Sequence, residues 1–215
     1  MNNTPFKTDA LLFDVDGTLW DSSEQVAETW KQACAEAGLP SEHITASGLK
    51  KEFGKLMTDI AISLFPTANE EQRAILLETC CTRENEDLLK NPPALYPGVR
   101  ELFDILKARK IPIIIISNCQ AGYIEVLIES HHLESYVAGH LCPGDTGMKK
   151  ADNIRLTVSR FNLKSPVYIG DTTGDEEAAA DAGIPFIHAA YGFGTAQNPD
   201  YTVQKPLDIA SLPIF

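Results

Sequence analysis

Apolar runs and segments of helical period alternate along the chain. Residues 10–13, 111–117 and 166–170 are short and almost wholly apolar, which is typical of buried strands. We expect further strands at residues 136–138 and 184–187. Apolar side chains recur every three or four residues between them, and the predicted helices are residues 22–37, 99–106, 122–130, 154–161 and 175–182. This alternation predicts an α/β fold with a parallel sheet flanked by helices.

One long stretch departs from the alternation. Residues 41–89 contain no convincing strand, whereas residues 49–64 and 70–89 have a helical period. Asn91-Pro92-Pro93 then interrupts the pattern. We therefore predict a core domain made of residues 1–20 and 91–215, with an all-helical domain of residues 21–90 inserted after the first strand.

Polar side chains follow three of the predicted strands at the point where each strand ends. They are Asp14 and Asp16 after the first, Ser117 and Asn118 after the second, and Asp171 and Asp175 after the fourth. Ligands of parallel sheets bind beyond the carboxyl ends of the strands, so we expect these residues to meet. Carboxylates that share a site repel one another unless a cation holds them, and oxygen ligands favour Mg²⁺. The sequence therefore predicts a magnesium site.

The residues around these acids are small. Gly17, Thr18, Gly170 and Gly174 expose backbone N–H groups and hydroxyls that suit a phosphate group. A bound phosphate carries more charge than one metal ion offsets, so a lysine is also expected. Lys149 and Lys150, which precede a predicted helix, are the local candidates, and Lys150 is nearer to the helix start.

The charge of the chain limits its partners. The net charge is -12 over 215 residues, and both nucleic acids and anionic membranes need a basic surface. We therefore expect neither as a partner, and an anionic small molecule would need a metal ion or a local positive group. No signal peptide or membrane span is recognised, so we expect a cytoplasmic protein, either a monomer or a weak homodimer. The five cysteines lack the pairing of a disulfide framework or a zinc site, and we expect reduced, buried thiols.

With these motifs in place, the chain resembles the phosphatase branch of the haloacid dehalogenase superfamily with a helical cap. The stretch from Asp14 to Thr18 matches its Asp-x-Asp-Gly-Thr motif, Ser117 matches the strand-ending Ser or Thr, and Gly170 to Asp175 matches the second acidic motif. The lysine motif departs from the usual Lys-Pro-x-Pro and reads Met-Lys-Lys-Ala-Asp. The resemblance implies a Rossmann-like core and a cap at residues 21–90.

The resemblance also implies a mechanism. Asp14 would attack phosphorus and form an aspartyl-phosphate, and Asp16 would act as acid and then as base. Asp14, Asp16 and Asp171 would bind Mg²⁺, with Asp175 supporting them. Ser117, Asn118 and Lys150 would bind the phosphoryl group of a small phosphorylated metabolite.

The sequence leaves several assignments open. Trp20 could line the substrate entrance or pack at the hinge of the insert. Lys51 and Lys55 could reach a second anionic group of the substrate or form a solvated basic face. A phosphomutase of the β-phosphoglucomutase type is an alternative reaction, and a phosphonatase would need Lys51 or Lys55 as a Schiff-base lysine. Asp16 argues against a dehalogenase, and the pair of Asp14 with Asp16 argues against a protein that only binds phosphate.

Overall fold

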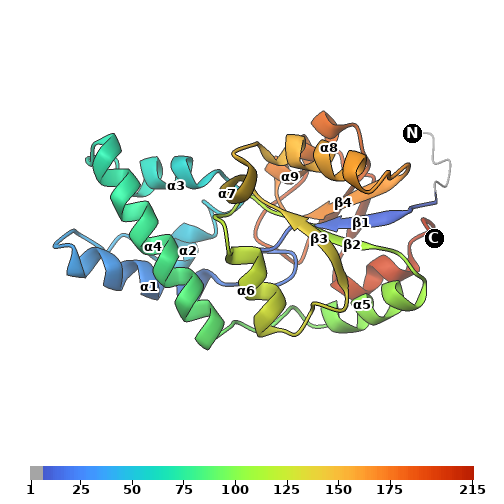
Figure 1. Ribbon diagram of the computed structural model, residues 1–215, viewed down its shortest axis with the longest axis horizontal. Coiled ribbons are helices and arrows are strands. Elements are labelled where there is room, and N and C mark those ends of the chain that lie inside the picture. The colour runs from blue at the N-terminus through green and yellow to red at the C-terminus, as the bar shows by residue number, and fades with distance from the viewer. Residues whose placement is uncertain (1–6) are drawn as a thin grey trace.

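A six-stranded, wholly parallel sheet lies at the centre of the computed structural model, which describes residues 7–215 (Figure 1). The strand order is β3-β2-β1-β4-β5-β6. The strands are β1 (Ala10–Phe13), β2 (Ile113–Ile116), β3 (Val137–Leu141), β4 (Pro166–Gly170), β5 (Phe186–Ala189) and β6 (Tyr201–Val203). The predicted α/β fold is confirmed, and β1 pairs with β2 on one side and with β4 on the other.

Both faces of the sheet are covered by helices, as the continuous apolar strands predicted. Leu11 and Phe13 of β1 belong to one hydrophobic cluster, whereas Ala10 and Leu12 belong to another. The first cluster includes side chains of α5 (Val99–Ala108), α6 (Tyr123–Ser130) and the 3₁₀ helix η1 (Pro206–Ser211). The second includes α8 (Lys150–Arg160) and α9 (Thr173–Ala182). Alternate side chains of each strand thus pack into opposite layers.

Four helices follow β1 and add no strand to the sheet. They are α1 (Ser23–Glu36), α2 (Ala46–Leu49), α3 (Met57–Leu64) and α4 (Glu70–Lys90), and we call residues 21–90 the helical insert. Figure 1 shows the helical insert to one side of the sheet. Its longest helices, α1 and α4, pack together, and Trp30 Nε1 donates a hydrogen bond of 2.6 Å to Glu84 Oε2. That the helical insert is a separate domain stays a prediction.

Several predicted elements differ from the structure in their bounds, and the helix expected at residues 154–161 begins already at Lys150. The helix expected at residues 49–64 is two helices separated by a turn, in which Gly54 has a φ of +87° that no right-handed helix allows. The expected strand at 136–138 continues to Leu141, and the one at 184–187 begins only at Phe186. The short edge strand β6 was not predicted.

The cysteines agree with the prediction. All five are free and buried. Within residues 7–215, no helix has both the length and the apolar character that crossing a bilayer requires.

Candidate active site

The three central strands bring the predicted polar residues to one edge of the sheet. Asp14, Ser117 and Asp171 directly follow β1, β2 and β4, which are neighbours in the order β2-β1-β4. The backbone N–H of Asp14 donates to the carbonyl of Ile169 at 2.9 Å, so the β1–β4 pairing extends to the first acid. All three side chains are buried.

Lys150 lies between two of the acids. Its Nζ is 2.8 Å from Asp14 Oδ1 and 2.6 Å from Asp175 Oδ1, and its side chain is only 3% exposed. Burial alone would lower the pKa of Lys150, but Asp14 and Asp175 raise it well above its usual value. Lys149, by contrast, is exposed at the residue before α8. The structure thus brings Lys150, and not its neighbour, to the predicted nucleophile, while its contact with phosphate stays a prediction.

Asp14 itself is held in a partly neutralised environment. Burial raises its pKa to about 6, with Lys150 acting in the opposite direction and Asp175 adding to the rise. A carboxylate beside a buried ammonium group keeps its charge at neutral pH, which a nucleophilic oxygen requires.

Asp16 receives hydrogen bonds that the sequence did not reveal. Tyr123 Oη donates a hydrogen bond of 2.8 Å to Asp16 Oδ2, and Ser22 Oγ donates one of 2.6 Å to Asp16 Oδ1. Burial raises the pKa of Asp16 to about 7, although the hydrogen bonds from Ser22 and Tyr123 lower it. A carboxyl group with a pKa near the working pH can both give and accept a proton, as a general acid and base must.

The carboxylates of Asp14, Asp171 and Asp175 form a group that fits a divalent cation. Each offers an oxygen, and these oxygens lie within 4.8 Å of one another. Asp171 Oδ2 accepts hydrogen bonds from the backbone N–H groups of Phe193 and Gly194, but its buried Oδ1 has no hydrogen-bond partner among residues 7–215. Burial, followed by Asp175 and Asp14, raises the pKa of Asp171 to about 8. A cation would supply the missing partner of Oδ1 and keep the acids ionised, so these residues fit Mg²⁺.

Glycines let the backbone approach Asp171 closely. A Cβ atom at Gly17 would lie 2.3 Å from Asp171 Oδ2, and one at Gly192 would lie 2.4 Å from Asp171 Cβ. Any larger residue would displace the carboxylate. The loop of residues 191–194 therefore positions a predicted metal ligand.

Asp175 has a second role. Thr172 is the N-cap residue of α9, and Asp175 completes a capping box with it. Asp175 Oδ2 accepts from the Thr172 backbone N–H at 3.0 Å, while Oδ1 faces Lys150. Asp175 thereby ties the start of α9 to the lysine. Its support of a metal ion stays a prediction.

The helical insert closes over these residues. Asn118 Nδ2 donates to the carbonyl of Gly54 at 2.8 Å, and the rings of Phe53 and Phe193 lie 6.0 Å apart. The cavity beneath the insert measures about 30 Å³, and both Asp14 and Asp16 line it. The side chain of Asn118 therefore holds the insert in place, while the contact of Asn118 with phosphate stays a prediction.

The part of the cavity formed by the insert is apolar apart from one acid. Its apolar lining consists of Trp30, Leu49, Phe53, Met57 and Ile60. Glu84 is 4% exposed and accepts a hydrogen bond of 3.0 Å from Gln120 Nε2 besides the one from Trp30. Burial raises its pKa to about 7, although these hydrogen bonds lower it. Glu84 was not predicted as a site residue, because it occupies an ordinary position of the long polar helix α4.

The structure does not bring the other predicted substrate contacts to the cavity. Trp20 is fully buried and packs edge-on against Tyr123, with ring centroids 5.7 Å apart, which agrees with the packing alternative of the two that the sequence left open. Lys51 is exposed, and Lys55 pairs with Glu52 at 2.8 Å. Over residues 7–215, no lysine or arginine lines this cavity.

Known proteins with the same features are found by sequence and by structure. The chain is 28% identical to a phosphoglycolate phosphatase of Photorhabdus laumondii, with 94% of this chain and 91% of that protein covered. A crystal structure described as a haloacid dehalogenase-like hydrolase from Bacteroides fragilis has a TM-score of 0.84 at 23% identity, covering 94% of this chain and all of that one. CbbY from Rhodobacter sphaeroides, solved in complex with xylulose-1,5-bisphosphate, has a TM-score of 0.77 at 17% identity, covering 94% and 96% of the two chains. Both structural similarities concern the fold.

The family assignment comes from the sequence as a whole. The model of one family, described as haloacid dehalogenase-like hydrolase, matches residues 11–189. This span runs from β1 to the end of β5 and includes every acid of the site. The chain therefore belongs to the haloacid dehalogenase-like hydrolase family.

Proposed function

We propose that this hydrolase is a magnesium-dependent phosphatase that cleaves the phosphomonoester of a small metabolite through an aspartyl-phosphate. The observation that carries the proposal is the ion pair between buried Asp14 and the Lys150 ammonium group. The second acid of the motif, Asp16, has a pKa near neutrality. Relatives named phosphoglycolate phosphatase support the phosphatase activity.

The residues divide the reaction between them. Asp14 forms a bond from its carboxylate oxygen to phosphorus, and the bond from phosphorus to the leaving oxygen breaks while Asp16 donates a proton to that oxygen. Asp16 then takes a proton from water, whose oxygen attacks phosphorus, and the bond to Asp14 breaks to release inorganic phosphate. Lys150 and Ser117 hold the phosphoryl oxygens. Mg²⁺, held by Asp14, the backbone carbonyl of Asp16 and Asp171, would neutralise the negative charge of those oxygens.

The position of the helical insert supports the proposal that the substrate is small. The cavity over Asp14 measures only about 30 Å³, so we expect a substrate to enter when the insert moves away from Asn118, and closure of the insert afterwards would exclude bulk water. Release of phosphate from p-nitrophenyl phosphate, measured with and without Mg²⁺, tests the activity. Transfer of the phosphoryl group to a sugar, with no phosphate released, would indicate the mutase instead.

The position of Tyr123 leads to a prediction about pH dependence. Because its hydrogen bond lowers the pKa of Asp16, Tyr123→Phe is expected to raise that pKa. Asp16 must be protonated to act as the acid, so the high-pH limb of kcat should move to higher pH. The loss of one hydrogen bond to the acid should also lower kcat about tenfold at its optimum. The pH profile of kcat checks both effects.

Tyr136→Phe is the matched control, because Tyr136 Oη donates to Asp104 and neither residue lines the cavity. It should leave the profile unchanged. A Tyr123→Phe profile that coincides with the wild type would contradict the assignment of Asp16 as the acid.

The lining of the cavity favours an uncharged leaving group. A leaving group with a carboxylate would find no cationic side chain in this cavity and would face Glu84. We therefore expect 2-hydroxyethyl phosphate, which has CH₂OH where 2-phosphoglycolate has a carboxylate, to be the better substrate. Because an unpaired buried charge costs several kcal/mol, the expected ratio of kcat/KM is about 10²-fold.

Glu84→Gln gives this comparison its control. Removing the carboxylate of Glu84 should raise kcat/KM for 2-phosphoglycolate and leave kcat/KM for 2-hydroxyethyl phosphate nearly unchanged. The ratio of the two values should therefore become smaller. If the wild type preferred 2-phosphoglycolate, the proposal of an uncharged leaving group would be wrong, whereas the proposal of phosphatase activity would still hold.

A further inference from the structure

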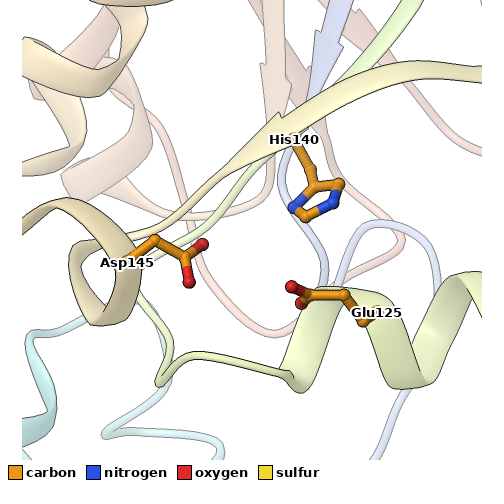
Figure 2. A group of neighbouring side chains, drawn as sticks. All are labelled: Glu125, His140 and Asp145. Atoms are coloured by element: carbon orange, nitrogen blue, oxygen red, sulfur yellow. The ribbon is translucent and has the colours of Figure 1, made fainter.

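A second group of metal-ligating side chains lies outside the active site. Glu125 of α6, His140 of β3 and Asp145 of α7 (Pro143–Thr146) come from three different elements. Their ligand atoms lie within 4.8 Å of one another, and Figure 2 shows the three side chains turned toward a common point. We propose that these residues form a binding site for a divalent transition-metal ion such as Zn²⁺.

The spacing of the group suits a bridging ion better than direct contacts. Within residues 7–215, none of the ion pairs at 4.0 Å or less and none of the side-chain hydrogen bonds joins any two of the three residues. An ion with bonds of about 2.0–2.2 Å to nitrogen and oxygen would lie between them after a small inward movement. Glu125 is an exposed acid whose side chain can make this movement.

His140 provides an independent observation. Its Nδ1 atom is buried and has no hydrogen-bond partner among the described residues. A buried ring nitrogen without a partner loses its hydration without compensation, which native structures generally avoid. Figure 2 shows the imidazole facing both carboxylates, so an ion held by them would also satisfy the ring.

The surroundings of Asp145 hold its carboxylate in place. Cys142 Sγ donates to Asp145 Oδ2 at 3.2 Å, and Cys142 is fully buried. Gly144 packs so closely on the preceding loop that a Cβ atom there would lie 2.0 Å from the backbone nitrogen of Ala121. A fixed carboxylate with an outer hydrogen-bond donor is a common arrangement around metal ligands.

The ligand chemistry distinguishes this site from the active site. One imidazole with two carboxylates offers mixed nitrogen and oxygen donors with a charge of −2, which suits Zn²⁺ and its neighbours better than Mg²⁺. The active-site acids offer oxygen alone. An ion at the second site would join α6, β3 and α7, close to the segment that leads into Lys150, and its role would be to stabilise that segment.

Metal content and thermal stability test the site on the full chain. Metal-free protein is incubated with Zn²⁺ in the presence of excess Mg²⁺, desalted, and its bound zinc is measured by elemental analysis. We expect wild type to retain one zinc more per chain than His140→Ala. Zn²⁺ should also raise the Tm of wild type by about 5 °C, and that of His140→Ala much less.

Two further variants keep the result clear. His132→Asn alters an exposed histidine with a φ of +52°, which asparagine tolerates, and should behave as wild type. Glu125→Gln alters only an exposed side chain, so it should fold normally and still lose the extra zinc. Equal zinc content and equal Tm shifts in wild type, His140→Ala and Glu125→Gln would overturn the proposal. Phosphatase activity with Mg²⁺ alone does not enter this test.

Discussion

Asp14→Asn is expected to lower kcat by about 10⁴-fold or more, because an amide nitrogen or oxygen cannot form the aspartyl-phosphate that the proposed reaction requires. The substitution keeps the size of the side chain, and Asp14 lies just beyond the end of β1. Phosphate release from p-nitrophenyl phosphate at saturating Mg²⁺ measures the effect, and circular dichroism verifies the fold.

Asp181→Asn is the matched control for Asp14→Asn. Asp181 is an exposed acid near the end of α9, and its substitution should leave kcat unchanged. Trapping of a phosphorylated chain after rapid acid quench should succeed with wild type and fail with Asp14→Asn. Activity of Asp14→Asn within tenfold of the wild type would rule out Asp14 as the nucleophile.

Lys150→Met is expected to reduce both stability and activity. The substitution leaves Asp14 and Asp175 buried without their shared cation, and breaking a buried ion pair from one side costs about 3–5 kcal/mol. For a chain of this size, the Tm in the absence of divalent ions should fall by about 10 °C. Thermal unfolding with and without Mg²⁺ separates the loss of stability from the loss of activity. A cation bound among the acids should recover part of the lost stability.

Lys149→Met removes the same charge one residue earlier. Since Lys149 is exposed, its loss should change neither Tm nor kcat noticeably. Equal effects of the two substitutions would contradict the assignment of Lys150. A Lys150→Met chain that is active but merely less stable would limit Lys150 to a structural role.

The predicted sheet and its acidic edge followed from local sequence. β1, β2 and β4 are continuous apolar runs, and each ends directly before a polar residue, so both the strands and their functional ends were visible. β6 was missed because only Val203 of its three residues is buried, which leaves an edge strand without a hydrophobic signal. The break at Gly54 was also missed, and the carbonyl of Gly54 accepts a hydrogen bond from Asn118, which follows β2 and is distant in sequence.

The side chains that assist the acids could not be predicted in the same way. Tyr123 and Glu84 occupy ordinary positions of α6 and α4. No local sequence pattern predicts that Tyr123 contacts Asp16 or that Glu84 contacts Trp30. Of the two lysines, only the register of α8 decides which one points inward. Such assignments depend on how helices dock, which a single sequence does not encode locally.

The central place of β1 has a consequence for synthesis of the chain on the ribosome. β1 is made well before β4, which pairs with one of its edges and begins at Pro166. Until that strand emerges, the growing chain has an apolar strand with an open edge, which is a point of vulnerability to aggregation. Asp171 and Asp175 emerge after the same strand. A nascent chain therefore gains the paired strand and the last acids of the site together, so the complete acidic cluster arises only after β4 has been made.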